Sequence, residues 1–180
     1  MRTRSKAVLA GAALVALTGS LMAGDKGEKT RFAVRADLVG GQEVPALSTT
    51  GRGHFRAWVD TEANVIYWKL SYDGLEGAVT QAHVHFGQHS VNGGISFFLC
   101  SNLANPPAGT QACPVAGPAE LEGTITPEAV IGPGPTATAP GQGIEPGAFA
   151  EIAAAIRGGL AYANVHTAKW PGGEIRGQLR

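Results

Sequence analysis

Aromatic residues are scarce in this chain and make up only 7% of its 180 residues. Glycine and proline are abundant instead, with 26 and 11 residues. Short strands joined by tight turns use many such residues, whereas a helical bundle does not. The composition therefore favours an all-β protein, and the length is sufficient for one domain with its own core.

The sequence also lacks a surplus of charge and any motif for nucleotide or acyl-enzyme chemistry. Its 14 basic and 14 acidic residues give a formal net charge of zero. There is no Gly-x-Ser-x-Gly elbow, no phosphate-binding Gly-Lys-Ser/Thr loop and no dinucleotide fingerprint after a strand. Without a basic stripe, nucleic acid is not expected as a partner.

A long apolar run occurs only near the N-terminus. Three basic residues and no acidic residue precede an apolar run over 7–17, and small residues follow it. This order predicts an export signal, a polar lead-in and a single domain, over residues 1–23, 24–30 and 31–180. The run is short for a retained membrane anchor, so no membrane span is expected after signal removal. We expect the mature protein in the periplasm or outside the cell.

Only two cysteines are present, Cys100 and Cys113, and twelve residues separate them. In an exported chain we expect this pair to form a disulfide around the loop between them. Such a bridge would contribute roughly 3 kcal/mol in the chain-entropy model. The alternatives are a pair of metal thiolates or two free thiols, which fit an oxidising compartment less well.

Alternation of polar and apolar residues predicts seven to eight short strands. The clearest pair is a hairpin of 53–60 and 65–72 around the tight turn 61–64. The other predicted strands cover 31–38, 81–87, 95–99, 121–126, 160–166 and 174–179. Short strands in this number predict an antiparallel Greek-key sandwich or barrel.

One short helix is predicted late in the chain. Phe149, Ile152 and Ile156 recur at helical spacing, and Gly158 and the glycine after it end the pattern. We expect this helix to pack across the barrel or to close one end of it. The Pro- and Gly-rich stretch before it, 127–147, is predicted to be a mobile surface excursion.

Three histidines are the candidate metal ligands. His83 and His85 occupy positions i and i+2 of one predicted strand, so they share a face and lie roughly 7 Å apart at the backbone. His166 lies on the polar face of a second alternating stretch. If the fold brings the three together, neutral imidazoles suit copper or zinc and leave a fourth position open. The alternative is that they form ordinary hydrogen bonds in a polar barrel wall.

Several polar residues are candidates for positioning the histidine rings through hydrogen bonds: Gln81, Asn164, Glu174 and Arg176. They could equally be ordinary hydrogen-bonding groups, and Arg176 could form an exposed ion pair worth less than about 1 kcal/mol. His89 could donate a fourth ligand, although a solvated loop residue is the simpler interpretation. His54 shares a strand face with Arg56 and Trp58, which favours a surface role.

Four pieces of sequence resemble the CHRD domain, named from chordin and widespread in exported bacterial proteins. They are LVGGQEVP at 38–45, AHVH at 82–85, YANVHT at 162–167 and PGGEIRGQL at 171–179. The resemblance covers 31–180 and implies an immunoglobulin-like β-barrel with limited similarity to copper–zinc superoxide dismutase. In those enzymes a similar His-Val-His step supplies copper ligands and a late strand supplies another, as His83, His85 and His166 would here.

The chain departs from the dismutases at the zinc subsite, which needs a bridging histidine and an aspartate. Here only His89 follows His85 closely, and no aspartate follows Asp73. This argues for a single-metal site, with copper favoured and zinc as the alternative.

Three functions are consistent with these residues. The first is an exported barrel that binds one copper ion through the three histidines. The second is a metal-free module that binds another envelope or extracellular protein, with Trp58, Tyr67 and Trp170 exposed for contact. The third is a copper-dependent enzyme that reacts with superoxide. We assign no catalytic residue and favour a role other than catalysis.

Overall fold

The computed structural model describes residues 30–104, 106–132 and 141–180. The predicted export signal and nearly all of the predicted lead-in lie outside these residues. Within them, eight strands form one antiparallel sheet in the order β5-β4-β7-β8-β1-β2-β3-β6. The strands are β1 (Arg31–Val39), β2 (Arg52–Asp60), β3 (Val65–Asp73), β4 (Val79–Phe86), β5 (Ile95–Ser101), β6 (Ala119–Ile125), β7 (Ala161–Thr167) and β8 (Ile175–Gln178). The expected antiparallel all-β fold is confirmed.

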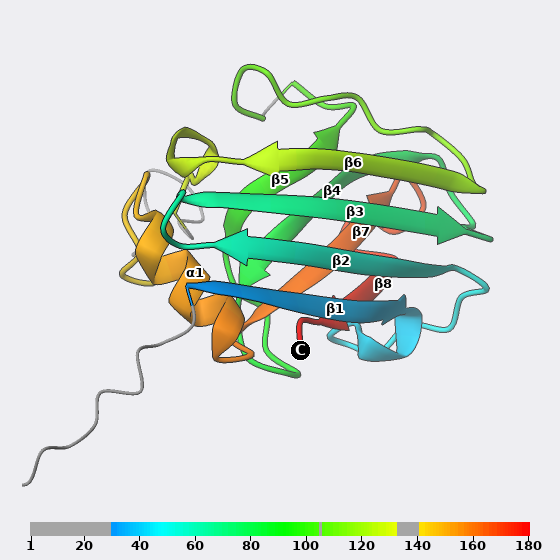
Figure 1. Ribbon diagram of the computed structural model, residues 1–180. Helices are drawn as coiled ribbons and strands as arrows, with labels where there is room; N and C mark the ends of the chain where they lie inside the picture. Colours follow the sequence, from blue (N-terminus) through cyan, green and yellow to red (C-terminus); the bar gives the residue numbers. More distant parts are fainter. Residues whose placement is uncertain (1–29, 105, 133–140) are drawn as a thin grey trace, which may run out of the picture.

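The sheet folds over into two layers that nearly close into a barrel (Figure 1). Strands β6, β3, β2 and β1 form the front layer, and β5, β4, β7 and β8 cross behind it. The layers join where Val39 of β1 pairs with Arg176 of β8. Because β5 and β6 end the strand order, the barrel is open between these two strands.

The predicted hairpin is confirmed as β2 and β3, which pair along their whole length. Phe55, Ala57 and Val59 alternate inward from β2 and are at most 2% exposed. The turn places Asn64 in the left-handed region, with φ 53°, which asparagine tolerates better than most residues. The burial of alternate residues therefore determines both the extended conformation of this segment and the face that packs against the core.

The single predicted α-helix is confirmed as α1 (Phe149–Arg157), which covers one end of the barrel (Figure 1). Its buried side chains include Phe149, Ile152 and Ile156, as the spacing predicts. The guanidinium of Arg157 lies 4.2 Å from the centre of the Phe32 ring and ties the helix to β1. Among the described residues, no helix is long and apolar enough to cross a membrane.

The stretch predicted as a surface excursion is partly built into the core. It begins with the 3-10 helix η2 (Pro127–Ala129), after which Val130 is only 2% exposed. The Ile131 N–H donates to the Ser96 carbonyl at 2.9 Å. The surface prediction is wrong here, because the barrel offers both apolar contacts and a backbone acceptor; residues 133–140 lie outside the described residues.

Cys100 and Cys113 form a disulfide beside the opening between β5 and β6. The nearby Gln111 amide spans the two open edges. Its Nε2 donates to the Leu99 carbonyl of β5 at 3.3 Å and to the Glu122 carbonyl of β6 at 3.1 Å. The disulfide therefore anchors the segment that links the two edges of the barrel.

Replacing Cys100 and Cys113 by alanine should lower the free energy of unfolding by about 3 kcal/mol, because the sequence separation of 13 closes a loop of moderate size. For a domain of this size, the melting temperature should fall by roughly 6–12 °C. Thermal unfolding of the double variant and the oxidised wild type checks this. Reduced wild type is the control and should melt with the variant; equal melting of all three proteins would contradict the prediction.

Candidate metal centre

The pairing of β4 with β7 brings the three histidines together. The two strands are antiparallel, and His166 lies directly opposite Gln81. In the same register, His85 lies opposite Tyr162. His166 is therefore a diagonal neighbour of His83 on the same face of the sheet, within side-chain reach.

The histidines face away from the barrel core. The residues that alternate with them, Ala82, Val84 and Val165, are fully buried in the core. The imidazoles consequently point to the outer face of the rear layer. Loops cover them there, so that His83 is 2% and His85 8% exposed, while His166 is half-buried.

The three ring systems are close enough to share one ion. His83 Nδ1 lies 2.8 Å from His85 Nε2. One ligand nitrogen from each of the three histidines lies within 4.8 Å of the other two. Metal–nitrogen bonds near 2.0–2.1 Å place tetrahedral ligands about 3.4 Å apart. Small side-chain rotations would therefore bring all three nitrogens to bonding distance.

Backbone carbonyls fix the tautomers of two histidines. His85 Nδ1 lies 2.8 Å from the Gly93 carbonyl, and His166 Nδ1 lies 2.8 Å from the Pro171 carbonyl. A carbonyl oxygen only accepts, so both Nδ1 atoms carry a proton and both Nε2 atoms keep a lone pair. His166 Nε2 is buried and has no hydrogen-bond partner among the described residues.

His83 carries its proton on Nδ1 as well. Because His85 Nε2 has a lone pair, His83 Nδ1 donates the 2.8 Å hydrogen bond between them. A metal ion needs deprotonated ring nitrogens. To hold an ion through Nδ1, His83 would have to carry its proton on Nε2 and give up its hydrogen bond to His85.

Burial keeps all three imidazoles neutral. It lowers the pKa of His83 well below its usual value, and the nearby His166 and His85 act in the same direction. Burial likewise lowers the pKa of His85 to about 4, against the effect of the Gly93 carbonyl. The pKa of His166 is lowered for the same reason. At neutral pH the three rings are thus in the form that binds a metal.

Tyr162 and Arg176 form the wall behind His85. The Tyr162 and His85 rings stack with centroids 4.6 Å apart and 5° between their planes. Arg176 Cζ lies 3.5 Å from the Tyr162 centroid. Arg176 is 1% exposed and donates to the Val91 carbonyl at 2.9 Å and to Asn92 Oδ1 at 3.1 Å. The exposed ion pair considered for Arg176 is therefore wrong.

A buried acid lies next to this wall. Asn164, opposite His83 in the register, donates from Nδ2 to Glu43 Oε1 at 2.6 Å. Glu43 is 8% exposed. Burial raises the pKa of its carboxyl to about 7, while the charge of Arg176 and the Asn164 hydrogen bond act to lower it. Glu43 was not predicted as a site residue.

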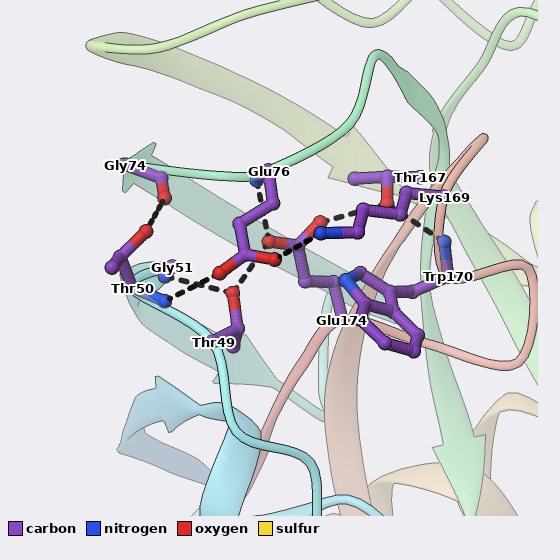
Figure 2. A network of polar contacts seen from close by, with 9 residues as sticks. All are labelled: Thr49, Thr50, Gly51, Gly74, Glu76, Thr167, Lys169, Trp170 and Glu174. Atoms are coloured by element: carbon purple, nitrogen blue, oxygen red, sulfur yellow. Dashed lines mark hydrogen bonds and ion pairs between the residues drawn. The ribbon is translucent and has the colours of Figure 1, made fainter.

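Glu174 belongs to a separate polar network, which Figure 2 shows. Its side chain is fully buried. The carboxylate accepts hydrogen bonds from the Thr49 hydroxyl at 2.8 Å, the Glu76 backbone N–H at 2.7 Å and the Thr167 hydroxyl at 2.7 Å. Glu174 therefore ties three chain segments together, and none of these bonds is to a histidine.

The other predicted polar residues lie at different distances from the centre. Gln81 Nε2 donates to Ser101 Oγ at 3.1 Å on the neighbouring strand β5. His89 is exposed and its Nδ1 lies 2.7 Å from Ser90 Oγ. His54 lies on the front layer, where its Nδ1 is 2.7 Å from Asp37 Oδ1. The structure thus gathers three of the chain's five histidines and leaves two at the surface.

Sequence reasoning missed Tyr162 and the two backbone carbonyls that orient the rings. A signal existed for Tyr162, which alternates with Asn164 and His166 on the polar face of its strand. No signal existed for the Gly93 and Pro171 carbonyls, because loop conformation decides where a backbone oxygen points.

A family model for the CHRD domain matches residues 34–179. The chain belongs to the CHRD domain family. Its CHRD domain contains all eight strands apart from the start of β1, together with the three clustered histidines and Arg176. None of the curated proteins and none of the solved structures matches the chain.

The CHRD domain should become more stable as the pH rises from 5 to 7. Below pH 6.5 the unfolded chain protonates histidines that the folded protein keeps neutral, so lowering the pH favours unfolding. For His85, lowering the pKa to about 4 in the folded state corresponds to about 3 kcal/mol over the whole titration, of which about 2 kcal/mol falls between pH 5 and 7. Urea unfolding at pH 5, 6 and 7 in the presence of a chelator measures this effect.

Glu43 provides the matched control because its contribution has the opposite sign. Its carboxyl has a raised pKa of about 7, so the folded state binds a proton that the unfolded chain releases, and its contribution to stability is lost as the pH rises from 4.5 to 7. Glu43→Gln should therefore make the rise in stability with pH steeper. A flat profile in both proteins would contradict the neutral, buried state of the histidines.

Proposed function

We propose that this CHRD domain protein is an exported β-barrel that binds one copper ion through His83, His85 and His166. One observation carries the proposal: three neutral imidazoles converge in a buried site where His166 Nε2 has no hydrogen-bond partner among the described residues. A buried lone pair without a partner costs free energy that a metal bond would recover. Imidazole suits copper and zinc, and we favour copper, with a fourth position left for water or another ligand.

Metal analysis of the purified mature protein tests this proposal. We expect one equivalent of copper per chain after copper loading, together with a higher melting temperature. Zinc is the alternative ion and should be tested in parallel. The proposal fails if neither ion binds stoichiometrically and neither changes the melting temperature.

Export to the periplasm or the extracellular space is part of the proposal. The Cys100–Cys113 disulfide fits an oxidising compartment. The N-terminal sequence has the order of a cleavable signal. Fractionation of the producing cells and N-terminal sequencing of the mature protein test it; a cytoplasmic protein that retains residues 1–23 would exclude it.

A second candidate function is binding of an acidic envelope or extracellular protein on the front layer. Trp58 and Tyr67 lie opposite each other on β2 and β3 and are 45% and 54% exposed. In the adjacent row, Arg35 and Arg56 lie opposite each other, and no acid in the described ranges forms an ion pair with either. Two opposed arginines without an anion are unfavourable, so an acidic partner would complement them. Trp170, which was expected in this surface, is only partly exposed.

Co-purification with wild type and with a Trp58→Ala/Arg56→Ala variant tests this second candidate. A partner captured by wild type and lost by the variant supports it, because both side chains are exposed and their loss should leave the fold intact. A partner retained by the variant, or none captured by either protein, excludes this surface.

A further inference from the structure

The three-histidine centre contains no negative charge. Its ligands are neutral imidazoles, whereas carboxylate or thiolate ligands would partly neutralise a bound ion. His83, His85 and the Nε2 atom of His166 are buried, which makes the charge of any ion there costly. The net charge of the occupied site would consequently equal the charge of the ion itself.

A buried cation lies close to this centre. Arg176 remains protonated in proteins, is 1% exposed and packs on the Tyr162 ring, with Cζ 3.5 Å from its centroid. The same Tyr162 ring stacks on His85. One aromatic ring therefore separates the guanidinium from a metal ligand, and water screens little of its charge.

No acid among the described residues forms an ion pair with Arg176. Glu43 interacts with Arg176 only through space; its Oε1 accepts a hydrogen bond from Asn164, and burial raises its pKa to about 7, so it is only partly ionised at neutral pH. The Glu174 carboxylate bonds to two threonine hydroxyls and a backbone N–H. Arg176 itself donates to an amide oxygen and to backbone carbonyls.

We propose that Arg176 makes the centre selective for a monovalent ion, so that the copper it binds is Cu(I) in preference to Cu(II) or Zn(II). This inference rests on the proposed metal function. Repulsion between a fixed charge and an ion is proportional to the ion's charge. The factor by which Arg176 weakens binding of a divalent ion is therefore the square of the factor for a monovalent ion. Imidazole ligands alone would not make this choice, because they suit Zn(II) and Cu(II) as well.

Three variants separate the charge of Arg176 from its packing. Arg176→Gln removes the charge, Arg176→Lys keeps it, and Arg56→Gln removes an exposed arginine from the front layer as a control. Ag(I) and anaerobic Cu(I) serve as monovalent probes, and Zn(II) as the divalent probe, each measured by competition with a chelator. Circular dichroism establishes that each variant is folded.

Wild type should bind Cu(I) and Ag(I) more tightly than Zn(II). Arg176→Gln should tighten Zn(II) binding by about tenfold and Ag(I) binding by only about threefold, following the square relation. Arg176→Lys and Arg56→Gln should keep the wild-type ratio of the two affinities.

Equal changes for both ions in Arg176→Gln would show that Arg176 acts on the fold of the site rather than through its charge, and would overturn the inference. A wild-type preference for Zn(II) would also overturn it, while leaving metal binding by the three histidines intact. Absence of binding by every ion would instead remove the proposed function first, and the inference with it.

Discussion

Copper should raise the melting temperature of the wild-type protein, and replacing His166 by alanine should abolish this rise. An ion that binds only the folded state stabilises it by about 4 kcal/mol at a thousand times its dissociation constant. For a domain of this size, that corresponds to a shift of roughly 8–16 °C. Two imidazoles from one strand cannot surround the ion, so the variant should show little shift. Thermal unfolding with and without added copper measures the difference.

The two histidines outside the cluster are matched controls. His54→Ala and His89→Ala remove exposed imidazoles from the front layer and from a loop, and both should retain the full copper shift. Loss of the shift in these variants would indicate nonspecific copper binding to surface histidines. A full shift retained by His166→Ala would exclude the three-histidine centre.

The local features of the fold were predictable because each depends on a few neighbouring residues. Alternation of Phe55, Ala57 and Val59 with polar residues identifies a strand and its buried face at once. The same alternation places the side chains of His83 and His85 on one face of their strand. Helical spacing and a terminal glycine likewise identified α1.

The pairing of β4 with β7 could not be read from periodicity. The alternation of polar and apolar residues shows that His166 lies on the polar face of its strand. Which strand pairs with it depends on the whole barrel. In the register observed, Gln81 lies opposite His166, and a shift by one residue would turn the imidazole toward the core. The proximity of the three histidines is therefore a property of the tertiary fold.

The loops above the centre were also beyond sequence reasoning, because their contacts join distant parts of the chain. Glu174 accepts a hydrogen bond from Thr49, 125 residues away. Its hydrogen bond from Thr167 spans the turn that carries Pro171, whose carbonyl orients His166. Glu174 is thus linked to the centre through the position of this turn and not through direct contact with a histidine.

Replacing Glu174 by alanine should lower the free energy of unfolding by about 4 kcal/mol. The reason is that two hydroxyls and one backbone N–H lose their buried acceptor at once (Figure 2). Copper affinity should also fall, by a few fold, because the turn before Glu174 would hold His166 less firmly. Chemical unfolding measures the first effect, and copper competition in the folded variant measures the second.

Glu174→Gln and Glu122→Gln are the control variants for this prediction. The glutamine at 174 retains one acceptor oxygen and its size, so about half of the loss, about 2 kcal/mol, should remain. Glu122 forms an exposed ion pair with Lys69, and its replacement should leave stability nearly unchanged because solvent screens such pairs. Equal stability of Glu174→Ala and Glu122→Gln would contradict the prediction. It would show that the buried network does not hold the three segments together and that the turn orienting His166 does not depend on Glu174.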